Sequence, residues 1–162
     1  MDNYPNNIFA KYIIDTCSIN SQKSNAKYDR TTFVTLWQKL DDLIRRKEIV
    51  IISLIYDEIN DEEIKNFVNN INITAIPLSK EIQDMATAIA TSSAKKNPKA
   101  IDFKNKRSST AFFMIATAKM YNLTIITEEK DSIQNNIPQI AKDNGVLCYN
   151  LYSFRIKNKW TF

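Results

Sequence analysis

The sequence predicts an α/β protein in three layers, with a central, largely parallel sheet covered by helices on both faces. Short apolar runs rich in β-branched residues recur along the 162-residue chain, and each is too short to form a helix. Segments with apolar residues at helical spacing separate these runs. Such alternation of strands and helices is typical of a parallel sheet.

The predicted elements follow one another without a long linker or an internal repeat. Strands are expected at 8–14, 49–52, 73–76, 123–126 and 146–148. Helices are expected at 33–44, 54–59, 82–90, 111–121 and just before Gly145. Residues suited to cap these helices are Thr31 or Thr32, Ser53, and the run 108–110. We therefore expect a single domain over residues 1–162.

The composition excludes several kinds of active site. The chain has no histidine, one glycine and two cysteines. Without histidine it cannot form a Ser-His-Asp triad or an HExxH zinc site. Its single glycine cannot form a dinucleotide or Walker phosphate loop, and two cysteines cannot form a Cys₄ zinc ribbon. The possibilities that remain are an active site that uses carboxylates, an active site that uses lysine, or a protein without catalytic activity.

The charge balance mildly favours a polyanionic partner. The chain carries 22 Lys and Arg against 18 Asp and Glu, for a net charge of +4 and a pI near 9.0. Its first residues are polar rather than those of a secretory signal. The longest apolar run, 49–56, is far shorter than the roughly 20 residues that span a bilayer. We expect a cytoplasmic protein with reduced thiols and no membrane contact.

One segment, 95–107, is unusually basic. It holds six basic residues and one acidic residue, Asp102, and it contains Pro98. Polar composition and proline predict a surface loop. The basic residues are Lys95, Lys96, Lys99, Lys104, Lys106 and Arg107.

Acidic residues stand just after three of the predicted strands. Asp15 ends the first strand, and Glu58 lies about one helical turn past the second, on the apolar side of its helix. Glu128 and Glu129 follow Thr127 after a later strand. Each residue alone also suits a turn, a cap or a solvated surface. Together they predict a site, because ligands bind beyond the carboxyl ends of parallel strands. Carboxylates without His or Cys select Mg²⁺ or Mn²⁺.

Three segments resemble the first, second and fourth acidic motifs of the PIN-domain nucleases: 12–18, 56–59 and 125–130. The closing Trp160-Thr161-Phe162 is similar to that of a bacterial subgroup related to VapC-type toxins. The resemblance implies metal-dependent phosphodiester hydrolysis, with Mg²⁺ or Mn²⁺ held by Asp15, Glu58 and Glu129, and Glu128 as the alternative ligand. It also implies that Thr16 or Thr127 positions a water or a ligand carboxylate.

The third acidic motif departs from the family pattern. PIN domains carry an Asp near the start of a helix that reads small-Asp-x-Phe-x-Ile-Ala, and Ala111 occupies that position in the matching stretch 110–116. An Asp in the first turn would be favoured by the helix dipole. Ala111 at this catalytic position predicts an impaired enzyme, either engineered or natural. Asp102 could replace the missing Asp only if the basic segment folded over the site.

The resemblance further implies partners. It suggests an RNA substrate, such as tRNA or rRNA, and a protein antitoxin, and it leaves a homodimer open. The basic segment 95–107 would contact phosphates, and Tyr28, Phe103 and Trp37 are candidates for base stacking. Trp37 also lies in helical register with core positions. Two alternatives are a non-catalytic PIN-like module that binds RNA or protein, and a structure-specific DNA nuclease.

Overall fold

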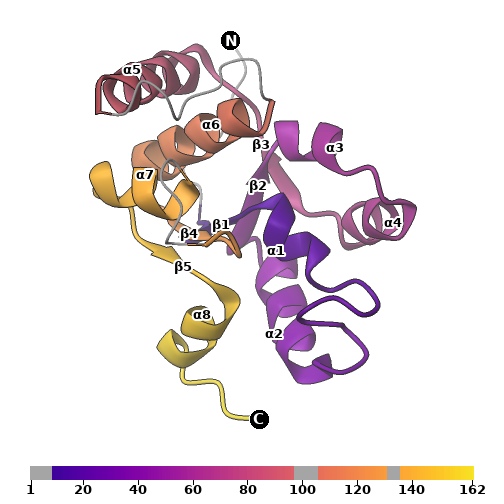
Figure 1. The fold of residues 1–162 in the computed structure, drawn as a ribbon. Coiled ribbons are helices and arrows are strands. Elements are labelled where there is room, and N and C mark those ends of the chain that lie inside the picture. Colours follow the sequence, from indigo (N-terminus) through magenta and orange to yellow (C-terminus); the bar gives the residue numbers. More distant parts are fainter. Residues whose placement is uncertain (1–8, 97–105, 131–135) are drawn as a thin grey trace.

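The structure, a computed structural model, describes residues 9–96, 106–130 and 136–162. Its centre is a five-stranded sheet in the order β3-β2-β1-β4-β5, with every pair of neighbours parallel (Figure 1). The strands are β1 (Tyr12–Ile14), β2 (Ile49–Ile52), β3 (Thr74–Ile76), β4 (Thr124–Ile126) and β5 (Cys148–Tyr149). The predicted α/β class with a parallel sheet is confirmed.

Eight helices are described in the same ranges of the chain. They are α1 (Thr16–Asn20), α2 (Val34–Arg45), α3 (Leu54–Glu58), α4 (Glu62–Ile71), α5 (Lys80–Lys96), α6 (Lys106–Tyr121), α7 (Ile137–Asp143) and α8 (Leu151–Lys157). None of the helices in these ranges is long and apolar enough to cross a membrane.

The strand order creates a switch point between β1 and β4. From β1 the chain moves outward to β2 and β3, and then returns past β1 to β4 and β5. Right-handed crossovers in opposite directions place the connecting helices on opposite faces of the sheet. Accordingly, α2 and α4 lie on one side, and α6 and α7 lie on the other (Figure 1). The connections diverge at the carboxyl ends of β1 and β4, where α/β folds bind ligands.

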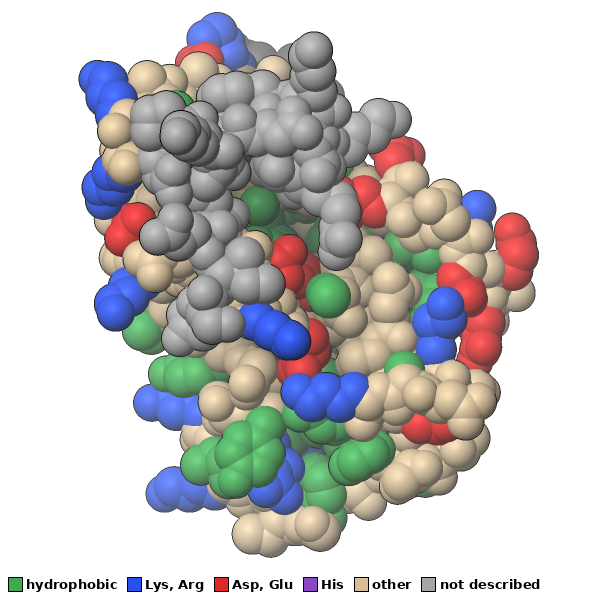
Figure 2. Space-filling model, viewed as in Figure 1, with side chains coloured by type: hydrophobic (Ala, Val, Ile, Leu, Met, Phe, Trp, Pro, Cys, Tyr) green, Lys and Arg blue, Asp and Glu red, His purple; other side chains and the backbone are tan. Residues whose placement is uncertain are grey.

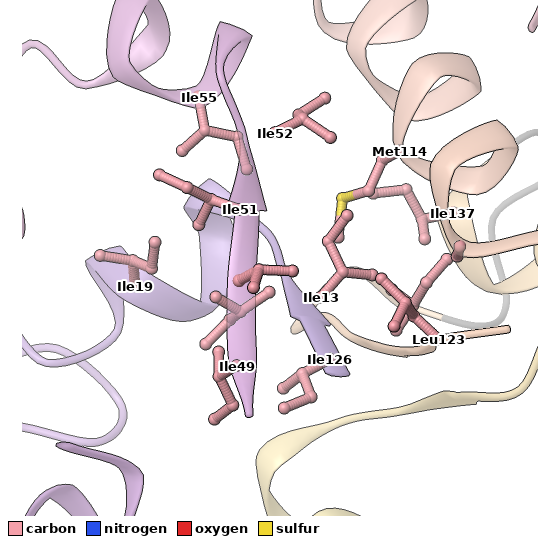
Figure 3. Packing of buried hydrophobic residues seen from close by; sticks show 14 of the residues in the cluster. Ile13, Ile19, Ile49, Ile51, Ile52, Ile55, Met114, Leu123, Ile126 and Ile137 are labelled. Atoms are coloured by element: carbon pink, nitrogen blue, oxygen red, sulfur yellow. The ribbon is translucent and has the colours of Figure 1, made fainter. Parts of the chain in front are cut away.

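The core forms because the central strands are apolar on both faces. All four residues of β2, Ile49–Ile52, are buried. Figure 3 shows Ile13 and Ile51 near the middle of the cluster, with Met114 of α6 and Ile137 of α7 on one side and Ile19 of α1 on the other. Burial on both faces explains why these strands read as continuous apolar runs rather than as alternating patterns.

Several helix boundaries differ from prediction. Helix α6 begins at Lys106, so the expected cap at 108–110 lies inside it. Helix α5 extends to Lys96, and α5 and α6 pack against each other. Packing between helices therefore extends both elements into the basic segment, where the sequence favours a loop.

The expected caps of two other helices have different outcomes. The N-cap of α2 is Phe33, not Thr31 or Thr32, and it makes no side-chain cap bond, so that prediction is wrong. Ser53 is the N-cap residue of α3 as predicted, although its side chain makes no cap bond. The hydroxyl of Thr31 instead donates to the Asp29 carboxylate at 2.7 Å, because the preceding chain turns before the helix begins.

Arg30 joins the segment after α1 to α2 and α4. Its guanidinium makes two hydrogen bonds to the Asp41 carboxylate of α2, at 2.7 and 3.0 Å, and a third to Gln22 at 2.8 Å. The same group lies over the rings of Trp37 in α2 and Phe67 in α4. The planar guanidinium suits both contacts, because it binds carboxylates with two donors and stacks on rings.

Replacing Asp41 should destabilise the protein. The Asp41→Asn substitution removes the charge that accepts two Arg30 bonds, and Asp41 is buried. We expect the free energy of unfolding, measured by urea denaturation, to fall by about 2 kcal/mol. Asp42→Asn is the matched control, because the Asp42 pair with Arg45 is exposed and 3.5 Å long. An equal loss in both variants would contradict the role of Arg30.

Candidate active site

A pocket of about 860 Å³ opens where the carboxyl ends of β1, β2 and β4 meet. Its lining includes Asp15, Glu58, Glu129 and Ala111, which come from four separate segments of the chain. Figure 2 shows acidic side chains in the hollow at the middle of this face, beside residues that are not described. The other lining residues are Thr16, Cys17, Asn20, Leu54, Ile55, Asp57, Asn60, Ser109, Thr110, Met114 and Ile137.

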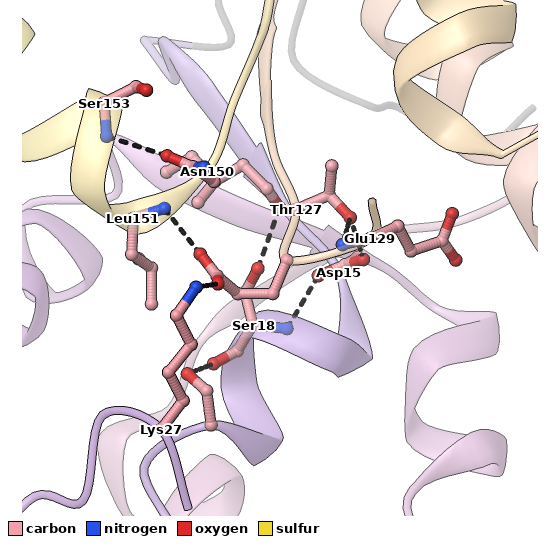
Figure 4. A network of polar contacts seen from close by, with 11 residues as sticks. Asp15, Ser18, Lys27, Thr127, Glu129, Asn150, Leu151 and Ser153 are labelled. Carbon is pink, nitrogen blue, oxygen red and sulfur yellow. Dashed lines mark hydrogen bonds and ion pairs between the residues drawn. The ribbon is translucent and has the colours of Figure 1, made fainter. Parts of the chain in front are cut away.

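Asp15 is held at the switch point by contacts with β4, with Thr127 just after it, and with helix α1. Its backbone N–H donates to the carbonyl of Ile126 at 3.1 Å. One carboxylate oxygen caps α1 by accepting from the Ser18 N–H at 2.8 Å, and the other accepts from the Thr127 hydroxyl (Figure 4). The residue is 4% exposed. This carboxylate is therefore fixed in orientation and shielded from water.

Burial makes the charged form of Asp15 unfavourable. Loss of hydration raises the pKa of Asp15 from its ordinary value of 3.8 to about 6, and the nearby Glu129 carboxylate adds to the rise. Hydrogen bonds from Thr127 and Ser18 favour the charged form and limit the shift. A positive charge in the pocket would offset the remaining cost.

Glu58 has two carboxylate oxygens in different surroundings. Its Oε2 accepts from the Thr16 hydroxyl of α1 at 2.9 Å, which ties the end of α3 to α1. Its Oε1 is buried and has no hydrogen-bond partner among the residues that the structure describes. A buried oxygen without a donor or cation is costly, so this atom marks a place where a ligand is expected.

Glu129 lies in the same pocket and is linked to Asp15 through Thr127. The Glu129 N–H donates to the Thr127 hydroxyl oxygen at 3.1 Å, and that hydroxyl donates to Asp15. The Glu129 side chain extends away from Asp15, and its Oε2 accepts from the Ile137 N–H at 2.9 Å (Figure 4). Thr16 and Thr127 thus both hold carboxylates, one of the two roles expected for them.

Glu128 does not line the pocket, contrary to its expected role as the alternative ligand. One of its oxygens pairs with Lys27 at 2.8 Å. The other accepts from the Leu151 N–H at 2.7 Å, at the start of α8 (Figure 4). Adjacent residues in an extended segment point in opposite directions, so Glu129 and Glu128 face different parts of the molecule.

Ala111 lies in the pocket beside the three acidic positions. It is 7% exposed, and Ser109 and Thr110 line the pocket with it. Because α6 begins at Lys106, Ala111 belongs to the second turn of the helix and not to the first. The expected helix-dipole effect at this position is therefore wrong, although the residue faces the predicted site.

The pocket offers oxygen atoms of the kind that divalent cations bind, but the described residues form no gathered set of ligands. Within the part of the chain that the structure describes, no three Asp, Glu or Cys side chains lie close enough together to hold a metal ion. The lining nevertheless supplies carboxylate, hydroxyl and amide oxygens, which suit Mg²⁺ or Mn²⁺. Two of these oxygens, on Glu58 and Asn20, are buried without a partner in the described ranges. By donor chemistry, the residues fit a hard cation.

The basic residues are only partly described. Lys95 and Lys96 belong to helix α5 and not to a loop, and Lys96 lies 3.6 Å from the Asp143 carboxylate. Lys106 and Arg107 begin α6, but their side chains are not described. Lys99 and Lys104, with Asp102 and Phe103, lie outside the described residues.

The expected stacking surface is not formed by Tyr28 or Trp37. Both side chains are buried, at 9% and 1% exposure. Trp37 Nε1 donates to the Tyr28 carbonyl at 2.6 Å, so the two residues pack the segment before α2.

Asn20 is the pocket residue that sequence reasoning missed. The sequence gives only one weak indication of Asn20, which is its position one helical turn after Thr16.

The stability of the metal-free protein should fall as pH rises from about 4 to 7. The folded state binds a proton at Asp15 more tightly than the unfolded state does, so deprotonation disfavours folding. A pKa rise from 3.8 to about 6 corresponds to a loss of about 3 kcal/mol. The chain has no histidine that would titrate in the same range.

Urea denaturation in a chelating buffer at several pH values measures this loss. Asp15→Asn should flatten the dependence between pH 5 and 7, whereas Asp42→Asn, at an exposed carboxylate, should not. The same slope in the wild type and Asp15→Asn would contradict the assignment.

Comparisons with known proteins agree with this fold. The crystal structure of FitAcB from Neisseria gonorrhoeae is similar, with a TM-score of 0.57 and 18% sequence identity over 87% of this chain and 98% of that chain. At this identity the likeness shows the fold, which is PIN-like. No curated protein matches the sequence. A family model described as "Domain of unknown function (DUF4411)" matches residues 12–162. The chain therefore belongs to the DUF4411 family.

Proposed function

We propose that this protein is a metal-dependent endoribonuclease of the PIN type, built as the toxin of a toxin–antitoxin pair and impaired by Ala111. One observation carries the proposal. Asp15, Glu58, Glu129 and Ala111 meet in one pocket at the switch point of a PIN-like fold, although they come from distant parts of the sequence. These are the positions at which the sequence resembles the PIN acidic motifs.

The proposed chemistry uses oxygen atoms of the chain and no nucleophilic side chain. Asp15 and Glu58, with Glu129 in the same pocket, would hold Mg²⁺ or Mn²⁺. When bound, such a cation lowers the pKa of a water molecule and stabilises charge on the leaving oxygen of a phosphodiester. Thr127 and Thr16 keep the Asp15 and Glu58 carboxylates oriented. Burial raises the pKa of Asp15 to about 6, so a bound cation would stabilise its charged form.

The proposed substrate is RNA, with tRNA and rRNA as the first candidates. The basic segment 95–107 leads into α6, which carries Ala111 in the pocket, so its Lys and Arg residues are suited to hold phosphates near the site. With such a target, we expect the protein to act in the cytoplasm. A protein antitoxin and a homodimer are the proposed protein partners.

A second candidate function is a PIN-like module that binds RNA or protein without cutting. Two observations favour it. Ala111 removes a carboxylate from the pocket, and the described Asp, Glu and Cys side chains are not gathered around a common point. Such a module would bind its partner equally well whether or not Asp15 and Glu58 carry charge.

Restoring the missing carboxylate should restore cleavage. We expect Ala111→Asp to cut total RNA in the presence of Mn²⁺ or Mg²⁺ at least about 100-fold faster than the wild type, because a fourth carboxylate enters the pocket. Denaturing gels of total RNA incubated with each protein measure the rate. Branched DNA in a parallel reaction tests the structure-specific DNA nuclease.

The control is a second substitution in the restored protein. Adding Asp15→Asn should abolish the cleavage, whereas adding Asp42→Asn, at an exposed carboxylate of α2, should leave it unchanged. Cleavage that survives Asp15→Asn, or that needs no divalent cation, would sink the proposal. RNA binding with no cutting by any variant would favour the binding module instead.

A further inference from the structure

Two oxygen atoms stand out in the part of the chain that the structure describes. The Asn20 Oδ1 and the Glu58 Oε1 are the side-chain oxygens there that are buried and have no hydrogen-bond partner. Both residues line the pocket of the proposed active site. Buried acceptors without partners are rare in folded proteins, and each calls for an explanation, of which a bound water or ion is one.

Asn20 and Glu58 are connected through Thr16. The Thr16 hydroxyl of α1 donates to the Glu58 Oε2 at 2.9 Å. Asn20 lies four residues later in α1, and residues four apart lie on the same face of a helix. Asn20 is therefore on the face of α1 that contacts Glu58. This face is fixed, because Asp15 caps α1 and the Ser18 hydroxyl donates to the Ile126 carbonyl of β4.

We propose that Asn20 is a ligand of the divalent cation in the proposed active site, where its Oδ1 and the Glu58 Oε1 take the cation together. Amide oxygens are ordinary ligands of hard divalent cations. A neutral ligand also suits this pocket, because Asp15, Glu58 and Glu129 already bring three carboxylates that repel one another. This inference rests on the proposed function, and it adds a ligand that no acidic motif contains.

A different arrangement makes the opposite prediction. The two ends of an amide can exchange places by rotation, so the Asn20 Nδ2 could instead donate to the Glu58 Oε1. Asn20 would then be a positioning residue that stabilises the metal-free protein. As a cation ligand, it carries an unsatisfied oxygen in the metal-free protein, and its removal should not lower stability.

The test is Mn²⁺ binding by the full chain, followed by isothermal titration calorimetry, together with the Tm of the metal-free protein. We expect Asn20→Ala to weaken Mn²⁺ binding at least tenfold and to leave the metal-free Tm unchanged or higher. Asn70→Ala is the matched control, because Asn70 is an exposed residue of α4 that does not line the pocket. Its Mn²⁺ affinity should stay within twofold of the wild type.

The outcomes separate this inference from the proposed function. If the wild type binds no Mn²⁺, both fail. If Asp15→Asn abolishes binding while Asn20→Ala leaves it intact, only the role of Asn20 is wrong. A lowered metal-free Tm in Asn20→Ala with unchanged Mn²⁺ affinity identifies a positioning residue. Should Asn20→Ala not fold, Asn20→Asp decides, because a changed charge at a ligand position must shift the Mn²⁺ affinity severalfold, and an unchanged affinity overturns the inference.

Discussion

The hydrogen bond from Thr127 to Asp15 is the contact on which the pocket depends. It crosses between β4 and β1, the two strands from which the chain departs in opposite directions. The Asp15 carboxylate also accepts from the Ser18 N–H in the first turn of α1. The Thr127 hydroxyl oxygen also accepts from the backbone N–H of Glu129. A single buried carboxylate thus sets the relative positions of α1 and the segment after β4, between which the pocket opens.

The fold keeps negative charge in a place where water cannot stabilise it. Burial raises the pKa of Asp15 to about 6, and one oxygen of Glu58 has no donor among the described residues. A fold selected for stability alone would remove such groups or pair them with Lys or Arg. Lys27 pairs with Glu128, which does not line the pocket, and not with the carboxylates of the pocket. This arrangement is consistent with a site kept ready for a cation.

The sequence predicts what depends on local pattern. The apolar runs at 49–52 and 123–126 mark strands correctly, and the acidic residues after three strands fall in one pocket. Helices α1, α4 and α8 are not predicted. Helix α1 has only five residues and depends on the Asp15 cap. Helix α8 depends on contacts with distant residues such as Glu128. Periodicity also cannot tell which of Glu128 and Glu129 faces the pocket, because both residues follow the end of β4 and lie outside the regular strand. Asn20 cannot be predicted from the sequence, because only the three-dimensional structure shows that its amide oxygen is buried without a hydrogen-bond partner among the described residues.

The position of Glu128 ties the C-terminal helix to the segment that carries Glu129. Its carboxylate binds the first N–H of α8, while its neighbour in the chain, Glu129, lines the pocket. Phe154 of α8 packs edge-on against Trp160, and Arg155 of α8 lies over the ring of Phe162, so the last residues are held to this helix. The exposed rings of Tyr152 and Phe162 thus belong to a part of the chain that is connected, through the Leu151–Glu128 hydrogen bond, to the residue next to Glu129. The last residues of the chain therefore help to fix the segment that carries the proposed catalytic Glu129.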